Sequence, residues 1–316
     1  PEGNKILLEM AKEMDILVEG YRPGVMKRLG LDYDTLQRIN PKLIYCSITG
    51  YGQTGPMANE AGHDINYVAL SGVLGSVGPV GQAPLPPLNL VADFAGGSLF
   101  ALNGILAALY EREKSGKGQY IDAAMIDGCL SLMAMHFPAW GTPFMPERGK
   151  NFTGGHFPFY RCYECSDGKF MSVGAIEPMF YATLCEKLGF DEAPEQMDTN
   201  MWESTAQQFE IAFKSKSREQ WTQIFEGSDA CVAPVLGPDE LWSHPQIQAR
   251  CGMVSDGSVP PAPVLSRSSL SRGEINEDNQ TYSVLREFGY NDEDIAAAMP
   301  KNVAQIDVVQ LFPPKM

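Results

Sequence analysis

The first fifty residues alternate between two spacings of apolar side chains. Apolar residues recur at helical spacing over residues 4–14 and again over 34–39. Residues 15–20 and 43–49 instead form short apolar runs with the composition of buried strands. The order helix, strand, helix, strand predicts an α/β fold with a parallel sheet.

Polar, glycine-containing turns follow both predicted strands. Residues 21–24 follow the first strand, and the loop 50–55 follows the second. A long helix over 94–113 and a strand over 120–125 extend the same pattern. Ligands of parallel α/β sheets bind outside the carboxyl ends of the strands. We therefore expect a ligand site at the edge of the sheet where these turns lie.

The pattern changes near residue 141, where a Gly- and Pro-rich stretch begins. A hairpin is predicted over 159–174, around a Ser-Asp-Gly turn. Helical patterns follow over 179–188, 202–214 and 218–226. These elements predict a smaller α+β domain over 148–267, after a large domain over 1–147. Two short helical patterns within 268–316 are expected to return to the large domain.

The composition argues against several classes of partner. The chain has 24 Lys and Arg against 39 Asp and Glu, a formal net charge of −15. This balance argues against nucleic acid or an anionic membrane surface as a partner. No apolar run reaches the length of about 18 residues that a membrane span needs, so none is expected. The seven scattered cysteines favour reduced thiols and an intracellular compartment.

The candidate chemistry begins at His63, one of four histidines, which is followed directly by Asp64. Asp64 is expected to cap a helix over 65–74, and either Asn89 or Asp93 is expected to cap the helix over 94–113. A lone histidine is more often a surface or capping residue, and aspartates are common N-caps. Together, a base and a carboxylate at two helix starts favour acid/base chemistry. Unpaired N–H groups at a helix start stabilise a developing negative charge.

Further charged side chains lie near the expected ligand edge. Arg22 and Arg28 fit an anion pocket in this acidic chain, although exposed arginines are commonly only solvated. Glu177 follows a predicted strand, where a helix-start glutamate before proline is the alternative interpretation. No histidines stand at metal-ligand spacing, so no metal site is predicted. The residues alone indicate an α/β enzyme with an acid/base site and an anionic ligand.

Six segments, taken together, resemble a known family in order and spacing. They are EGYRPGVMKRLGL (19–31), LIYCSITGYGQTGP (43–56), AGHDINY (61–67), PPLNLVADFAGGS (86–98), GKGQYIDAAMIDG (116–128) and VGAIEPMFY (173–181). These segments are similar to those of the α-methylacyl-CoA racemases in the family III CoA-transferase (CaiB/BaiF) superfamily. GHDINY and the glutamate in GAIEP are the more specific of these motifs.

The resemblance implies a Rossmann-like large domain with a parallel sheet and a smaller α+β domain. It implies an interlocked homodimer with each active site between the large domain of one chain and the small domain of the other. The substrate is implied to be a 2-methylacyl-CoA thioester, interconverted between its (R) and (S) forms. CoA arrives as part of the substrate, so neither a cofactor nor a metal is implied. The expected compartment is the peroxisome or mitochondrion in a eukaryote and the cytoplasm in a bacterium.

Carried over residue by residue, the resemblance implies His63 and Asp93 as the two catalytic bases. Asp64 and Glu177 are implied as supporting acids. Contacts with the CoA thioester are implied for Gly20, Tyr21, Arg22, Arg28, Gly62, Asp64, Ile65, Asn66 and Tyr67.

Two alternatives stay open. A family III CoA-transferase would use an aspartate at the position of Asp93 as a nucleophile that attacks the thioester. The family also has a first βα unit before the position of Pro1, which is apparently missing here. A truncated chain that binds acyl-CoA without activity is therefore the second alternative.

Overall fold

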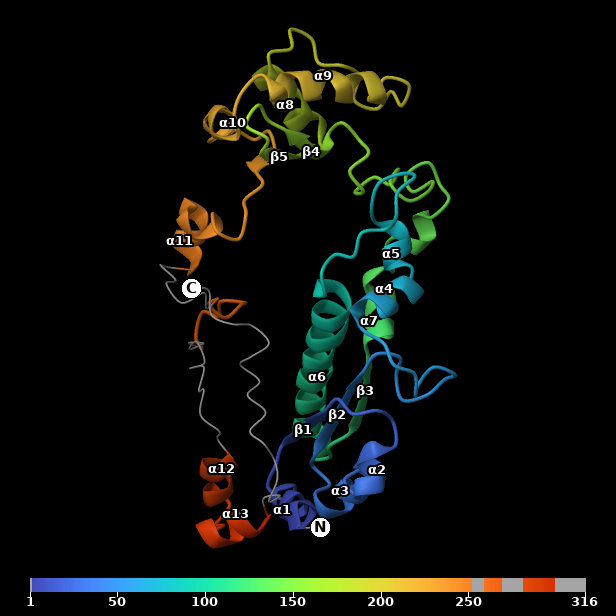
Figure 1. Ribbon diagram of the computed structural model, residues 1–316, viewed down its shortest axis with the longest axis vertical. Coiled ribbons are helices and arrows are strands. Elements are labelled where there is room, and N and C mark those ends of the chain that lie inside the picture. Colours follow the sequence, from blue (N-terminus) through green and yellow to red (C-terminus); the bar gives the residue numbers. More distant parts are fainter. Residues whose placement is uncertain (1, 252–258, 269–280, 299–316) are drawn as a thin grey trace. The chain divides into compact units, whose positions relative to one another are not determined.

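The computed structural model describes residues 2–251, 259–268 and 281–298 (Figure 1). Contacts divide the chain into two units. Unit 1 contains the described residues up to Tyr67, residues 90–128 and the described residues after 273. Unit 2 contains residues 68–89 and the described residues from 129 to 268. Contacts alone do not define folding domains, so the boundaries near 147 and 267 stay a prediction.

Unit 1 is built on a parallel sheet, as the alternating elements predict. Its strands are β1 (Ile16–Glu19), β2 (Ile44–Thr49) and β3 (Tyr120–Ala124), in the order β1-β2-β3. Both strand pairs are parallel, with Ile16 opposite Ile44 and Tyr45 opposite Tyr120. The mixed α/β class with a parallel sheet is therefore confirmed.

Successive side chains of β2 enter two different cores, because neighbouring residues of a strand point to opposite faces. Tyr45 packs with Leu36 and other apolar residues near α3. Ile44 and Cys46 pack on the other face with Ala101 and other residues of α6. The helices of this unit include α1 (Glu2–Met10), α2 (Val25–Leu29), α3 (Tyr33–Ile39), η1 (Leu90–Leu99) and α6 (Phe100–Ser115). The central strand is thus covered on both faces.

The C-terminal helices of the described chain pack against the N-terminal helix. They are α12 (Thr281–Glu287) and α13 (Asp292–Ala298). Leu285 and Ile295 form one small core with Ile6 and Met10 of α1.

Within the described residues, the helical stretch Leu90–Ser115 is long and apolar enough to cross a membrane, by length and composition alone. This is weak evidence, because core helices of globular proteins meet the same two criteria. Ala101, Ile105 and Ala108 of this stretch are buried against the sheet of unit 1.

Unit 2 contains a three-stranded antiparallel sheet covered by helices. The sheet has the order β4-β5-β6 and consists of β4 (Tyr160–Glu164), β5 (Phe170–Gly174) and β6 (Val232–Pro234). The hairpin predicted over 159–174 is confirmed. Its helices include α8 (Pro178–Leu188), α9 (Trp202–Lys214) and α10 (Arg218–Phe225). Aromatic side chains dominate the core, including Phe157, Phe159, Tyr163, Phe209, Phe213 and Trp221.

Four further α-helices lie in the described part of the chain, and two of them pass from one unit to the other along the chain. They are α4 (Asp64–Leu70), α5 (Val73–Ser76), α7 (Met125–Leu132) and α11 (Pro245–Cys251).

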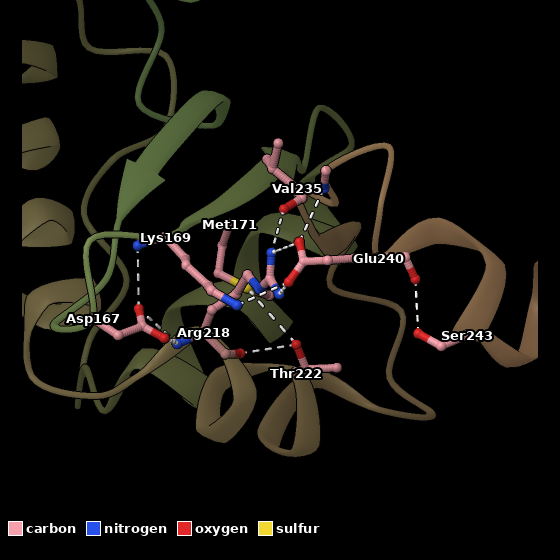
Figure 2. A network of polar contacts seen from close by, with 9 residues as sticks. Asp167, Lys169, Met171, Arg218, Thr222, Val235, Glu240 and Ser243 are labelled. Atoms are coloured by element: carbon pink, nitrogen blue, oxygen red, sulfur yellow. Dashed lines mark hydrogen bonds and ion pairs between the residues drawn. The ribbon is translucent and has the colours of Figure 1, made fainter. Parts of the chain in front are cut away.

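A cluster of charged side chains fixes the segment that follows β6 (Figure 2). The Arg218 guanidinium donates to both oxygens of Glu240, at 2.8 and 2.6 Å, and Lys169 donates to the same carboxylate at 2.8 Å. Arg218 also donates to the Val235 carbonyl at 2.6 Å. The hydrogen bond from Arg218, followed by those from Gly237 and Lys169, holds the pKa of Glu240 well below its usual range.

Replacing Glu240 by Gln should lower the urea midpoint of the chain at pH 7. A carboxyl whose folded-state pKa is lowered stabilises the fold above its unfolded pKa, near 4.5. The difference between E240Q and the parent chain should therefore be full at pH 7 and shrink as the pH falls below about 4.5.

Glu164→Gln is the matched control. Its ion pair with Lys214 joins side chains that are 45% and 49% exposed, so its loss should change the midpoint little. A midpoint difference for E240Q that is equal at pH 7 and pH 3.5 would contradict the electrostatic origin.

Candidate active site

A pocket of about 360 Å³ lies at the carboxyl ends of the strands of unit 1. Ile48 and Thr49 at the end of β2 line it, together with Met125 directly after β3. Six residues that the sequence marked as site residues line the same pocket: Gly20, Tyr21, Arg22, Gly62, His63 and Tyr67. The ligand edge expected from the parallel sheet thus contains a real cavity.

His63 lies at the head of α4, where its exposed side chain lines the pocket. Its carbonyl accepts the backbone N–H groups of Asn66 and Tyr67, at 2.8 and 3.4 Å. The Asn66 side chain accepts the N–H of His63 at 3.0 Å. This is half of a capping box, in which a side chain three residues into the helix returns to the cap residue. Asn66 therefore holds the backbone that carries His63.

Two glycines make room for the aromatic wall of the pocket. Tyr67 is 8% exposed, and its ring meets that of Tyr51 edge-on with centroids 5.0 Å apart. A Cβ at Gly50 would lie 2.1 Å from the Tyr67 ring, and one at Gly62 would lie 2.7 Å from the same ring. Tyr51 was not predicted as a site residue. Its position inside the glycine loop, between Gly50 and Gly52, was the available indication.

Asp64 is buried, with 6% exposure, and its carboxylate does not cap its own helix. One oxygen, Oδ2, accepts the backbone N–H groups of Ala92 and Asp93 at 2.8 and 2.9 Å. The prediction that Asp64 caps a helix over 65–74 was wrong, because Asp64 is the first residue of α4 and its carboxylate caps η1 instead.

Asp93 lies inside the first turn of η1 and does not cap a helix over 94–113, because helical structure already begins at Leu90. Burial raises the pKa of Tyr67, and the charges of Asp93 and Asp64 contribute to the rise. Asp93 itself does not line the pocket, whereas Tyr67, whose pKa its charge helps to raise, does.

The remaining predicted residues lie outside the lining of this pocket. Arg28 is an exposed residue of α2, whereas Ile65 and Asn66 belong to the first turn of α4. Glu177 belongs to unit 2, where it is the exposed N-cap of α8 without a side-chain cap hydrogen bond. The role of Glu177 beside His63 stays a prediction, as do the CoA contacts.

Glu19 was missed from the sequence. Its carboxylate accepts the backbone N–H of Tyr21 at 2.7 Å and the hydroxyl of Ser47, which in turn accepts from the Tyr120 hydroxyl at 3.1 Å. These contacts hold the turn that carries Tyr21 and Arg22. An acid at the last position of an apolar strand was the available indication.

Within the described residues, no group of three or more His, Cys, Asp or Glu side chains is placed to hold a metal ion.

Comparison with known proteins places this arrangement in a family. The model of CoA-transferase family III matches residues 1–268. The chain belongs to this family. α-Methylacyl-CoA racemase of Mus musculus is 42% identical over 319 residues, which cover 97% of this chain and 83% of the relative. The human racemase is also 42% identical, over 93% of this chain and 80% of the relative.

Family III relatives of this chain also include transferases. Human succinyl-CoA:glutarate CoA-transferase is 32% identical, over 78% of this chain and 58% of the relative. A CaiB/BaiF family protein from Brucella suis has a crystal structure that is similar with a TM-score of 0.73 and 27% identity. The match covers 90% of this chain and 78% of that one. Membership of the family therefore confirms the resemblance. Because the family contains both racemases and transferases, the residues of the site must decide between racemisation and CoA transfer.

Replacing Gly50 by Ala should destabilise the chain by about 1–3 kcal/mol, the usual range for overpacking a well-packed site. The new methyl group would overlap the buried Tyr67 ring, which Tyr51 contacts edge-on. Urea unfolding measures the change.

Gly20→Ala is the matched control at the same pocket, because its Cβ would meet only the Ile48 carbonyl at an ordinary 3.7 Å. Equal stability of the two variants would contradict the packing described for Tyr67.

Proposed function

We propose that this chain is an α-methylacyl-CoA racemase, which interconverts (R)- and (S)-2-methylacyl-CoA thioesters. The observation that carries the proposal is the link between the two candidate bases. His63 lines the pocket at the head of α4, and its neighbour Asp64 accepts the backbone N–H of Asp93 at 2.9 Å. The racemases from mouse and human, at 42% identity over nearly the whole chain, support the same choice.

The reaction inverts a carbon next to a thioester carbonyl, so it needs a base on each face. In one direction His63 takes the α-proton, and the electron pair of the broken C–H bond moves into the thioester carbonyl to form an enolate. Asp93, in its protonated form, then donates a proton to the other face of the α-carbon. In the reverse direction the two groups exchange roles. Proton transfer of this kind needs side chains that change protonation near neutral pH.

The enolate oxygen needs hydrogen-bond donors while its charge develops. The backbone N–H of Asp64 is the proposed donor, because the first N–H groups of a helix lack an acceptor within the helix. Glu177 is proposed to orient His63 by accepting from the other ring nitrogen. No redox cofactor is needed, because no electrons leave the substrate, and the peptide N–H of Asp64 is proposed to stabilise the enolate oxygen without a metal.

The CoA part of the substrate is proposed to bind around the turn after β1. Gly20, Tyr21 and Arg22 line the pocket there, and Glu19 fixes their backbone. The proposal extends to Arg28 and to the stretch 62–67. A homodimer in which Glu177 comes from the partner subunit remains part of the proposal.

The second candidate is CoA transfer, which the transferase relative at 32% identity favours. Asp93 would then attack the thioester carbonyl, and CoA thiolate would leave as an acyl-aspartate anhydride forms. His63 argues against this candidate, because a transferase has no use for a second base. A chain that binds acyl-CoA without turnover is the third candidate.

Deuterium wash-in at the α-carbon of a 2-methylacyl-CoA in D₂O tests the choice. The parent chain should exchange the α-proton and invert the carbon. Either His63→Ala or Asp93→Asn should slow inversion by about 10²-fold or more, because each removes one required base. His244→Ala is the control, since this histidine belongs to unit 2 and its ring accepts the Gln246 N–H at 3.2 Å.

Three results would count against the racemase. Undiminished inversion by His63→Ala would remove the two-base mechanism. Trapping of an Asp93 acyl adduct with hydroxylamine would favour the transferase. Binding of acyl-CoA without exchange by the parent chain would leave the third candidate.

A further inference from the structure

The Asp64 carboxylate is buried beside the start of η1, where hydrogen bonds from peptide N–H groups stabilise it. A buried carboxylate is costly unless hydrogen-bond donors surround it. Two peptide N–H groups, those of Ala92 and Asp93, converge on the single oxygen Oδ2 at 2.8 and 2.9 Å. The first N–H groups of a helix have no acceptor within the helix, so the carboxylate replaces the missing acceptors.

The segment that receives this carboxylate has an uncommon backbone. Residues Leu90–Leu99 form a π-helix of ten residues. Such helices are rare and are frequent at functional sites. The Ser98 hydroxyl donates to the carbonyl of Asp93 at 2.9 Å. The peptide groups on both sides of the Asp93 Cα are thus held, one by Asp64 and the other by Ser98.

We propose that Asp64 is a positioning residue for Asp93, which acts through its side-chain carboxylate. The carboxylate fixes the N–H of Asp93, and with it the direction in which the Asp93 side chain leaves the backbone. Because Asp64 directly follows His63 in the chain, one residue ties the two candidate bases to each other. This inference rests on the proposed racemase function.

The two oxygens of Asp64 differ in their contacts, and the difference supplies a sharp test. Oδ2 accepts both N–H groups, whereas Oδ1 is buried and has no hydrogen-bond partner among the described residues. Asp64→Asn keeps one carbonyl oxygen that can take the place of Oδ2. Asp64→Ala keeps none. A positioning role therefore predicts that Asn restores what Ala loses.

The experiment compares Asp64→Ala, Asp64→Asn and Ser98→Ala with the parent chain. Wash-in and inversion are measured separately from each enantiomer of a 2-methylacyl-CoA. Misplacing a catalytic group by about 1 Å can cost up to about 10²-fold in rate. For Asp64→Ala we expect kcat for inversion to fall at least about tenfold with little change in KM, because this carboxylate does not line the pocket.

The enantiomers should respond differently. The enantiomer whose α-proton faces His63 should keep most of its wash-in, since His63 is untouched. Its inversion, and the wash-in of the other enantiomer, should fall. Asp64→Asn should stay within a few-fold of the parent chain, and Ser98→Ala should show a smaller version of the Asp64→Ala pattern.

A second readout does not depend on turnover. Amide hydrogen exchange of Asp93, followed by NMR, should be faster in Asp64→Ala and close to the parent value in Asp64→Asn. Asp32→Ala is the matched control, because the Asp32 carboxylate accepts the Thr35 N–H at 2.9 Å and caps α3 in the same unit. In this control, wash-in from the two enantiomers and the exchange rate of the Asp93 amide should both match those of the parent chain.

Three results would overturn the inference while leaving the proposed function in place. The first is equal loss of wash-in from both enantiomers in Asp64→Ala. The second is an Asp64→Asn variant as slow as Asp64→Ala. The third is an Asp93 amide that exchanges at the parent rate in Asp64→Ala. Absence of wash-in by the parent chain is a different result, which rejects the proposed function and with it the catalytic role of Asp64.

Discussion

A carboxylate that is buried away from water needs hydrogen-bond donors around it. This requirement determines how the site of unit 1 is arranged. Asp64 meets it with two peptide N–H groups that come from a segment 28 residues later in the chain. The contact joins the start of α4 to the start of η1, where the two candidate bases lie. A shift of either helix would leave the charge of Asp64 unpaired, so the arrangement of His63 and Asp93 is tied to the cost of burying that charge.

The sheet of unit 1 and the turns that follow its strands form the pocket next to this contact. The parallel strands end at one edge, so the turns after β1 and β2 reach the same pocket. Glu19 holds the first turn, and Gly50 admits the Tyr67 ring beneath the second. Glu19 and Gly50 are a polar and a small residue at the ends of apolar strands. Core packing no longer determines which residue type is tolerated at these positions.

Much of the fold follows from local patterns. The strands of unit 1 and the hairpin of unit 2 are recognisable because the period of their apolar residues is a property of the segment itself. The pocket edge follows from the predicted parallel sheet, because ligands of such sheets bind outside the carboxyl ends of the strands. The partner of the Asp64 carboxylate could not be found in this manner, since an aspartate at a helix start looks the same whether it caps its own helix or a distant one. The π-helical start of η1 and the function of Glu19 likewise depend on tertiary contacts. The role of Glu177 depends on how separate parts of the molecule meet, which no local pattern encodes.

The chain between α4 and η1 leaves unit 1, contributes residues 68–89 to unit 2 and then returns. The hydrogen bonds from Ala92 and Asp93 to Asp64 hold the two ends of this loop together. Closing a flexible loop costs only about 0.6 kcal/mol more for each doubling of its length. Insertions among the exposed residues 81–86 should therefore change the cost of closing this loop only slightly. The sequence of this loop can therefore vary while Asp64 keeps its contact with η1. This makes the loop a suitable place for grafting or library design.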